Sequence, residues 1–494
     1  MSSSSLLESG LRQGRLGTVH LVFFTVAASA PLTVLGGGVT TMYAVSGNVG
    51  GALSYLLLAA VLAVFAVGYA AMSRFVSNAG AFYSYVANGL GRAGGVASSF
   101  VALASYNAIQ IGLYGLFGAI VGDFVSEKIG LTQPWWVWAL LGMALVGVLG
   151  VLQVDLNATV LAVLLVLECV AVAIFDLVSF GNPADGTVSF AGLDPGNLFA
   201  AGLGAVLALA VASFTGFESG AIYSEEVRDP RRTVARATYA AVAFTGGFYA
   251  LSAWALTVVT GPDKVQAVSA EAGPGIVFST LAEHVGGIVA DLAYALFVTS
   301  VLAALLSFHN GVARYLFALG RERVLPAYLS RTGVRTGAPV AGSLTQSALA
   351  FGVVIAFVLA GRDPVLDLFT WLSGVAAVGV VLLMTLTSAA VVGFFRRRPE
   401  PGISLWQRAI APGLATVLLL GVLAVLLANF DALLAPENPR YLAWLLPGIT
   451  VLAGLLGLGW GLALRTIRPA VYASVGRGPA ETVPTDDPAL ALAR

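Results

Sequence analysis

Hydrophobic residues along the chain form twelve long runs separated by short polar stretches. Most of the runs reach or exceed the roughly 20 residues that an α-helix needs to cross the hydrocarbon core of a bilayer. We find none of the ten-residue stretches of alternating hydrophobicity that form membrane β-barrels. The pattern therefore predicts an all-α membrane protein with 12 transmembrane helices, near residues 19–45, 50–72, 95–122, 135–152, 157–180, 198–223, 235–260, 286–318, 340–360, 366–394, 410–430 and 442–464.

The composition supports a bilayer as the solvent of most of the chain. Hydrophobic residues make up 58% of the sequence and charged residues only 10%, whereas soluble domains carry about 25% charged residues. The 25 basic and 25 acidic residues leave no net charge, which argues against nucleic acid as a partner. Membrane lipid is the expected surrounding.

The basic residues predict an orientation. With both termini in the cytoplasm, 21 basic residues fall on the cytoplasmic side, and only Lys128, Lys264, Arg362 and Arg440 fall outside. Such an excess is typical of cytoplasmic segments. We therefore expect an even number of spans and an integral protein of the bacterial inner membrane.

The polar stretches divide the chain into four regions. Residues 1–17 form a cytoplasmic tail, 18–394 a core of helices 1–10, 395–468 helices 11 and 12, and 469–494 a polar tail expected to be disordered. Within the core, the segment 72–95 is too polar to span and has aromatic residues at helical spacing, so we expect it to lie along the cytoplasmic face.

Two of the predicted spans look interrupted. Helix 1 contains "SAPLTVLGGGVTT" (29–41) and helix 6 contains "SFTGFESG" (213–220). They open two successive blocks of five helices, about 18–180 and 198–394, and interrupted spans at matching positions mark the binding site of inverted-repeat transporters. The freed backbone groups are tolerated in a membrane where they line a cavity. The alternative is that these glycines serve close helix packing.

Few acidic residues lie within the spans. Glu168 is midway along helix 5, and Glu218 follows the interruption of helix 6. A carboxyl group at this depth must be paired, hydrated or protonated, so each is either a proton carrier or a hydrogen-bonded structural acid. Glu225, Glu226 and Arg228 reach the cytoplasmic end of helix 6, where we expect a gate or a loop ion-pair network.

The residue patterns of enzymes are missing. The three histidines, His20, His284 and His309, are scattered, and we find neither metal-ligand spacing nor a nucleophile elbow nor a phosphate-binding loop. We therefore expect no catalytic residues, no cofactor and no resident metal.

Three segments resemble the amino acid–polyamine–organocation superfamily. "SFTGFES" followed by "EEVRDPRRTVARA" resembles its helix-6 signature, "LLSFHNGVARYLFALGRERVLPAYLSR" (305–331) its helix-8 signature, and "SNAGAFYSYVANGLG" the segment after helix 2. They occur in the family's order and at similar spacings. The resemblance implies a leucine-transporter-type fold, a 5+5 inverted-repeat bundle with two additional C-terminal helices.

The resemblance also implies a site between helices 1 and 6. A substrate carboxylate would meet backbone N–H groups of the helix-1 break, and its amine would meet carbonyls of residues 213–216, as helix ends favour. Phe214 and Phe217 would form an aromatic lid, with core packing as the alternative. The implied set is Ala30, Pro31, Leu32, Thr33, Gly36, Gly37, Tyr106, Asn107, Gln110, Tyr114, Ser213, Phe214, Thr215, Gly216, Phe217, Glu218, Trp371 and Ser373.

The helix-1 motif departs from that of many relatives, which have glycine-serine-glycine where this chain has "APLTVLGGG". The break could centre on 31–33 or on 36–38. Carboxylate binding is therefore left open, and an amine without a carboxylate is an alternative substrate.

The coupling ion is inferred from helices 5, 6 and 8. Relatives that run without sodium often have a lysine at the helix-5 position that resembles Glu168, and a carboxylate there would carry a proton or hold a cation. Sodium-coupled relatives have adjacent hydroxyls on helix 8, where we note Ser307 beside His309. Glu218 resembles the glutamate of "GVES" in arginine–agmatine antiporters. We expect protons rather than sodium to be coupled, with Glu168, Glu218 and Ser307 as candidates.

The resulting hypothesis is a secondary active transporter that takes up an amino acid or related amine by proton symport and alternating access. An amino acid/amine antiporter and a polyamine- or ethanolamine-type transporter are the alternatives. A non-transporting receptor would be expected to carry a large soluble domain. The expected partners are the small-molecule substrate and membrane lipid, and the chain would act as a monomer or homodimer.

Overall fold

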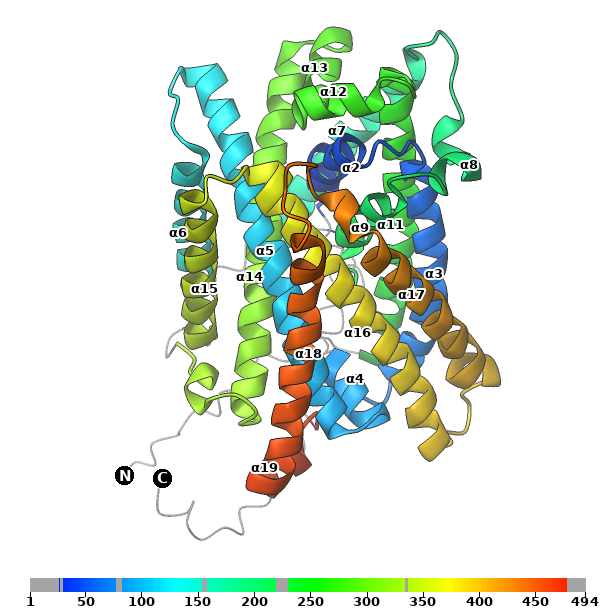
Figure 1. Ribbon diagram of the computed structural model, residues 1–494, viewed down its shortest axis with the longest axis vertical. Coiled ribbons are helices and arrows are strands. Elements are labelled where there is room, and N and C mark those ends of the chain that lie inside the picture. The colour runs from blue at the N-terminus through cyan, green and yellow to red at the C-terminus, as the bar shows by residue number, and fades with distance from the viewer. Residues whose placement is uncertain are drawn as a thin grey trace.

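The computed structural model describes residues 26, 30–76, 82–152, 158–218, 230–333 and 336–477. All regular elements in these ranges are helices, and they run alongside one another in a single bundle (Figure 1). Ten of the described helices are long and apolar enough to cross a membrane, so the chain is an integral membrane protein. They are α3 (Gly51–Met72), α5 (Arg92–Ile129), α6 (Trp135–Leu152), α7 (Ala158–Gly181), α11 (Pro230–Thr260), α14 (Gly287–Arg321), α15 (Val340–Leu359), α16 (Thr370–Arg397), α17 (Ala411–Ala428) and α18 (Leu442–Ile467).

These ten helices coincide with ten of the twelve predicted spans. The other two predictions fall on shorter pieces, namely η1 (Thr33–Val39) with α2 (Thr40–Ser46), and α9 (Leu203–Phe214). They are the spans predicted to be interrupted. The count of twelve spans and the pairing of repeats remain predictions.

Short helices cover the two ends of the bundle. In Figure 1, α8, α12 and α13 lie at one end, and α4 and α19 lie at the other. The short elements are α4 (Phe82–Gly89), η2 (Ala191–Leu193), α8 (Pro195–Leu198), α12 (Val265–Ala272), α13 (Gly275–His284), η3 (Ala327–Ser330), η4 (Pro364–Phe369), η5 (Trp406–Ile410), η6 (Phe430–Leu433) and α19 (Pro469–Ser474).

The contact between α5 and α18 shows how small residues allow close packing. A Cβ atom on Gly457 would lie 2.8 Å from the Cα of Ala97, and one on Gly461 would lie 2.9 Å from the Cα of Ala93. Both pairs are four residues apart, so one face of each helix presents small residues to the other. This is the packing that membrane helices use when lipid supplies no hydrophobic drive.

The helix α4 lies at the bundle end opposite α12 and α13, which is the cytoplasmic end in the predicted orientation (Figure 1). It is not an exposed surface helix, however, because almost all of its residues are buried. Its aromatic rings pack on α3, with the Phe82 and Tyr69 ring centroids 5.8 Å apart, and Gly89 lies directly against the backbone of Ala390 on α16. The aromatic periodicity that suggested a membrane surface serves packing within the protein.

The start of the C-terminal tail also differs from its prediction. Residues 469–477 are ordered: they form α19 and a turn that is fixed to the bundle. The Gly476 N–H donates to Glu322 Oε2 at 3.1 Å, Asn88 Nδ2 donates to the Gly476 carbonyl at 3.2 Å, and Val475 is buried. Polar composition alone did not reveal these contacts. The rest of that tail and the N-terminal tail lie outside the described residues.

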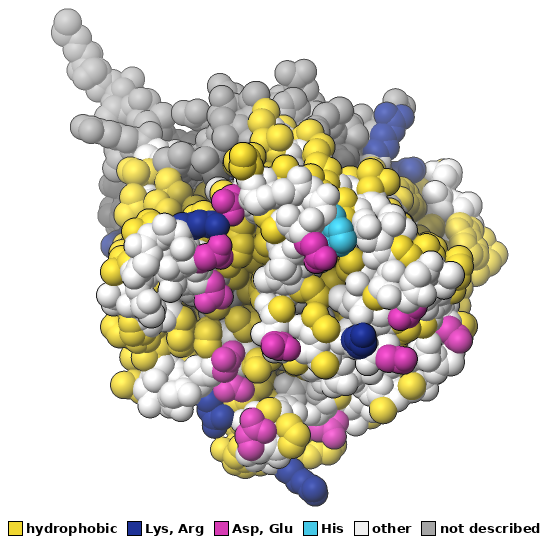
Figure 2. All heavy atoms as spheres, turned by 90° about the horizontal axis from the view of Figure 1, so that it is seen from above, with side chains coloured by type: hydrophobic (Ala, Val, Ile, Leu, Met, Phe, Trp, Pro, Cys, Tyr) yellow, Lys and Arg dark blue, Asp and Glu magenta, His cyan; other side chains and the backbone are white. Residues whose placement is uncertain are grey.

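The bundle end that carries α12 and α13 is rich in acidic side chains. Figure 2 views this end and shows several Asp and Glu side chains but few Lys and Arg side chains. One of the acids, Asp291, pairs with Lys128 at 2.7 Å. This end would be the outer one in the predicted orientation.

Candidate functional site

The helix α9 ends where the sequence predicts the break of helix 6, and residues 219–229, which follow it, lie outside the described residues. The helix α9 ends at Phe214, and Thr215 has extended backbone angles (φ −60°, ψ 128°). Gly216 then takes φ +112°, a conformation that side-chain-bearing residues rarely adopt. The backbone thus leaves the helix at Thr215 and Gly216, as "SFTGF" predicts, and the continuation of helix 6 after this point stays a prediction.

Helix 1 is irregular at a different place from its three glycines. Ala30 has φ +45°, which is uncommon for a residue other than glycine, and Pro31 begins the helical part that follows. The π-helix η1 contains Gly36–Gly38 and continues directly into α2. Of the two break positions left open by the sequence, the structure thus favours the one beside Pro31.

The two interrupted helices approach each other closely. A Cβ atom on Gly38 would lie 3.1 Å from Ser213 Oγ, and Ser213 also shares a hydrogen bond of 3.0 Å with the Tyr55 hydroxyl. A larger residue at position 38 would push η1 away from α9. The glycine therefore serves close packing at the point where the site is expected.

A small cavity lies between η1, α5, α9, α14 and η4. Most of the wall is apolar, and three hydroxyl groups come from the interrupted helices. The lining residues are Thr33, Val34, Gly38, Ile109, Leu113, Leu209, Ala212, Ser213, Thr215, Ala304, Phe308 and Phe369.

Glu168 is connected to this cavity by a chain of hydroxyl groups. The carboxylate is 4% exposed, and its Oε2 accepts a hydrogen bond of 2.7 Å from the Ser300 hydroxyl. Ser300 Oγ lies 3.0 Å from Thr33 Oγ1, and Thr33 lines the cavity. The backbone N–H of Leu32 also donates to Glu168. One carboxylate on α7 therefore joins the helix-1 break to α14.

Ser300 was missed by the sequence reasoning, which pointed to Ser307. Ser307 lies on α14 and is half-buried, seven residues after Ser300. The missed signal was visible, because Thr299 and Ser300 are adjacent hydroxyl residues on the same helix. What the sequence could not show is that this turn of α14 faces Glu168.

Glu218 is held within its own break. Its Oε2 accepts from the Gly216 N–H at 3.0 Å, and its Oε1 accepts from the Tyr106 hydroxyl at 2.7 Å. The side chain is 1% exposed. It therefore ties the unwound segment to α5, and it does not line the cavity.

Phe214 and Phe217 also lie outside the cavity wall. Phe214 packs on Tyr55 with ring centroids 5.9 Å apart, and Phe217 packs on Phe65 at 6.0 Å. Both contribute to a smaller hollow between α3, α9, α16 and α17. Their lid function remains a prediction, and the geometry is that of core packing.

Asn107, Gln110 and Tyr114 of α5 do not line the cavity, and Gln110 instead faces His309 on α14. Gln110 Nε2 lies 3.3 Å from His309 Nδ1 and donates to the Tyr114 hydroxyl at 3.3 Å, while Asn107 Nδ2 donates to the Leu103 carbonyl. The cavity instead meets the neighbouring face, with Ile109 and Leu113. The predicted polar face of α5 therefore lies beside the cavity rather than in its wall.

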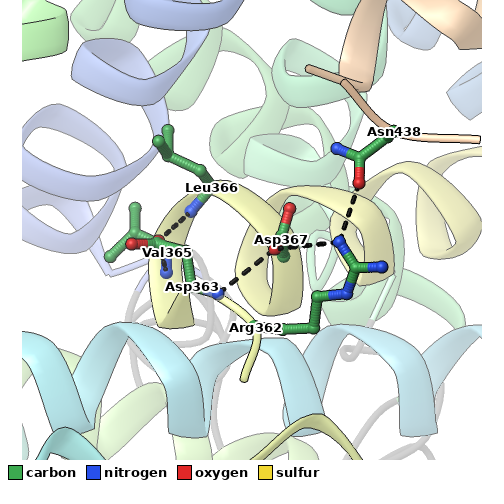
Figure 3. Close-up of polar contacts among 6 residues, drawn as sticks. All are labelled: Arg362, Asp363, Val365, Leu366, Asp367 and Asn438. Carbon is green, nitrogen blue, oxygen red and sulfur yellow. Dashed lines mark hydrogen bonds and ion pairs between the residues drawn. The ribbon is translucent and has the colours of Figure 1, made fainter. Parts of the chain in front are cut away.

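The start of helix 10 supplies Phe369 to the cavity instead of Trp371 or Ser373. Figure 3 shows how this start is fixed. Asp363 Oδ1 accepts from the N–H groups of Val365 (2.8 Å) and Leu366 (2.7 Å), and Arg362 donates to Asn438 Oδ1 at 2.8 Å. The cap and the cross-link hold η4 against the loop before α18. Trp371 and Ser373 are buried outside the cavity lining.

The predicted gate residues Glu225, Glu226 and Arg228 lie outside the described residues. Within the part of the chain that the structure describes, no group of three or more His, Cys, Asp or Glu residues could hold a metal ion. The remaining helix-1 candidates, Ala30, Pro31, Leu32, Gly36 and Gly37, are buried around the break.

Comparison with known proteins agrees with this architecture. The chain is 28% identical over 312 residues to an uncharacterized transporter of Mycobacterium tuberculosis, covering 58% of this chain and 64% of the relative. It is 24% identical over 398 residues to the branched-chain amino acid permease of Lactococcus lactis, covering 75% of this chain and 79% of that permease. The match to the chloroplastic cationic amino acid transporter 7 of Arabidopsis thaliana is 28% identical over 212 residues and covers 41% of this chain and 32% of that protein.

The profile of the amino acid permease family, described as "Amino acid permease", matches residues 16–455. This range includes both interrupted helices, the cavity and Glu168. It also agrees with the resemblance to the amino acid–polyamine–organocation superfamily, which is thereby confirmed. The chain belongs to the amino acid permease family.

Proposed function

We propose that the protein is a proton-coupled symporter that takes up an α-amino acid with an apolar side chain. The observation that carries the proposal is the apolar cavity whose Thr33 hydroxyl is linked through Ser300 to the buried carboxylate of Glu168. The protein would sit in the bacterial inner membrane with both termini cytoplasmic.

The cavity wall supports an apolar substrate side chain. Ile109, Leu113 and Phe308 are among the eight apolar residues that line it, and none of the described lining residues is acidic. A cationic side chain would lose its hydration there without an ion pair, which is costly in a membrane interior. The printed name of the Lactococcus lactis relative, a branched-chain amino acid permease, agrees with this inference, whereas that of the cationic transporter does not.

The hydrogen bonds of Glu168 suggest how proton and substrate binding are coupled. The ionised carboxylate engages the Leu32 N–H, one of the donors expected to bind the substrate carboxylate. Protonation of Glu168 removes its negative charge. This weakens the hydrogen bond from the Leu32 N–H, and it also weakens the repulsion between Glu168 and the substrate carboxylate. The proton and the amino acid would therefore each favour binding of the other, as thermodynamic linkage requires.

Exchange of an amino acid for an amine is the second candidate. An amine without a carboxylate would not need the Leu32 N–H, and its positive charge would favour the ionised form of Glu168, so protonation would not promote its binding. The lack of an acidic residue in the described part of the cavity wall favours the amino acid over the polyamine. The symporter and the exchanger differ in whether uptake requires a proton gradient.

The experiment is uptake of radiolabelled leucine into proteoliposomes under an inward proton gradient. We expect accumulation that a protonophore abolishes, and that excess valine or isoleucine inhibits whereas lysine and putrescine do not. Thermal stabilisation of the purified protein by the same apolar amino acids provides a second measurement, because a ligand that binds the folded state stabilises it. Uptake that needs sodium and ignores the protonophore, or inhibition by putrescine alone, would contradict the proposal.

A further inference from the structure

Asp176 is a second buried carboxylate on α7 that the proposed function does not use. It lies eight residues after Glu168 and five before the end of the helix at Gly181. At about 1.5 Å of rise per residue, it is about 12 Å from Glu168 along the axis, toward the end that would be outer. Residues four and eight apart lie along one side of a helix, and Val172 between them is buried.

The surroundings of Asp176 do not satisfy a carboxylate. The side chain is 3% exposed. Its Oδ2 accepts from the Ser252 hydroxyl of α11 at 3.0 Å, but its Oδ1 is buried and has no hydrogen-bond partner among the described residues. The hydroxyl of Ser179, three residues later on α7, is likewise buried without a partner there. Buried polar atoms in a native protein are normally paired, so this cluster points to a missing ligand.

Ser252 could bond to this carboxylate in either protonation state. Its single hydroxyl hydrogen has two acceptors at 3.0 Å, Asp176 Oδ2 and the Phe248 carbonyl. When the hydroxyl donates to Phe248, a hydrogen between Ser252 and Asp176 must come from a protonated carboxyl group. A proton on Asp176 can therefore be accommodated by rotation of one hydroxyl.

Neighbouring charged groups do not explain the burial of Asp176. The helices α11, α13 and α14 pack against α7. At the same end they carry Glu283, His284 and Asp291, which are exposed, Tyr294, which donates to the Ile120 carbonyl, and Tyr249, whose ring packs on Tyr55. None of the ion pairs in the described part of the chain involves Asp176.

We propose that Asp176, Ser179 and Ser252 form a second coupling-ion site, which takes up a proton on the outer side of Glu168. An O–H bond forms on the Asp176 carboxylate when a proton arrives from outside, and it breaks when the proton leaves toward Glu168. The inference rests on the proposed proton symport and on the predicted orientation. In this inference, Asp176 is the group whose protonation makes uptake depend on external pH.

The test compares four variants in proteoliposomes: Asp176→Asn, Asp176→Glu, Ser252→Ala and, as a matched control, Asp185→Asn. Asparagine keeps the acceptor for Ser252 but cannot take up a proton. Asp185 lies exposed beyond the end of α7, so Asp185→Asn should leave gradient-driven uptake and its pH dependence unchanged. Gradient-driven leucine uptake is measured across external pH, and counterflow exchange is measured at equal pH on both sides.

We expect Asp176→Asn to lower gradient-driven uptake by about fivefold or more and to flatten its dependence on external pH, while counterflow continues. Asp176→Glu should restore a pH dependence. If Asp176→Asn and Ser252→Ala depress gradient-driven uptake and counterflow equally, Asp176 is a structural link between α7 and α11 and the inference is wrong. A change in sodium dependence without a change in the pH profile also contradicts it.

Glu168→Gln is measured in parallel to separate this inference from the proposed function. If Glu168→Gln loses gradient-driven uptake while Asp176→Asn keeps the wild-type pH profile, only the second site is rejected. If the protonophore leaves wild-type uptake unchanged, proton symport itself is rejected.

Discussion

Each of the two interrupted helices has a buried glutamate at its interruption, and the two glutamates are bonded in similar ways. Glu168 accepts from the Leu32 N–H of the helix-1 break and from Ser300 on α14. Glu218 accepts from the Gly216 N–H of the helix-6 break and from Tyr106 on α5. In the predicted repeats, α5 and α14 are helices 3 and 8, which occupy equivalent positions.

The difference is in the helix from which each carboxylate comes. Glu218 belongs to the broken segment and lies two residues from Gly216, so it moves with its own break. Glu168 belongs to α7 and bonds to helix 1 and α14 at once, so displacement of helix 1 must change its hydrogen bonds. A carboxylate shared by three helices can link a proton to a conformational change, whereas a local one mainly stabilises a turn.

Replacing each glutamate by glutamine gives the largest expected difference. Glu168→Gln should reduce gradient-driven uptake to background while exchange continues, because the amide cannot carry a proton. Glu218→Gln should retain the gradient response, since an amide can accept from the Gly216 N–H and donate to the Tyr106 oxygen. Uptake under an imposed proton gradient measures both, and unchanged uptake in Glu168→Gln would refute the assignment of Glu168.

Removing one hydroxyl donor from each carboxylate should have the next largest effect. Ser300→Ala removes the donor to Glu168 and the link to Thr33, while Tyr106→Phe removes one of the two donors to Glu218. Hydrogen bonds to charged groups contribute about 1.5–3 kcal/mol, so both variants should lower thermal stability.

The two hydroxyl variants are distinguished by transport. Ser300→Ala should also shift the pH dependence of uptake, whereas Tyr106→Phe should leave the pH dependence unchanged. An identical pH shift in both variants would mean that the two breaks are coupled, contrary to the comparison.

Exchanging glycine for alanine at one break and alanine for glycine at the other should change the melting temperature in opposite directions. Gly216→Ala places a side chain at φ +112°, and Ala30→Gly removes one from φ +45°. A left-handed conformation costs a residue with a side chain about 1–2 kcal/mol, so the first variant should lower the melting temperature and the second should raise it. Gly413, whose Cβ position is open, is the control site for a glycine-to-alanine change. A lowered melting temperature for Ala30→Gly would show that Ala30 is not strained.

The sequence predicted the positions of the helices better than their rotations. Hydrophobic length placed ten spans close to their observed ends. The residues of "SFTGF" placed the helix-6 break, because a glycine among polar residues disfavours a continuous helix directly. Ile109 and Gln110 are neighbours, yet the apolar one lines the cavity and the polar one meets His309. Which of two adjacent faces meets the cavity depends on the packing of five elements, and one chain's residue order does not specify it.

The helix-1 break shows a second limit. Three consecutive glycines are the stronger local signal, but here they allow η1 to approach Phe297, Leu116 and Ser213, and the irregular backbone falls at Ala30. Glycine permits both a break and a close contact, so the choice between them is made by the neighbours. The link from Glu168 through Ser300 to Thr33 has the same origin, since residues 33, 168 and 300 meet only after folding.

The smallest expected difference concerns the two threonines that line the cavity from the two breaks. Thr33 bonds across to Ser300 at 3.0 Å, whereas Thr215 donates to the Val211 carbonyl of its own helix at 3.2 Å. Valine has the same shape as threonine, so Thr33→Val and Thr215→Val each remove one hydroxyl, a change of about 0.5–1.5 kcal/mol. We expect Thr33→Val to alter the pH dependence of the leucine KM and Thr215→Val to leave it unchanged. If Thr215→Val produces the larger shift, helix 6 rather than helix 1 transmits the proton to the substrate, and the roles of Glu168 and Glu218 are exchanged.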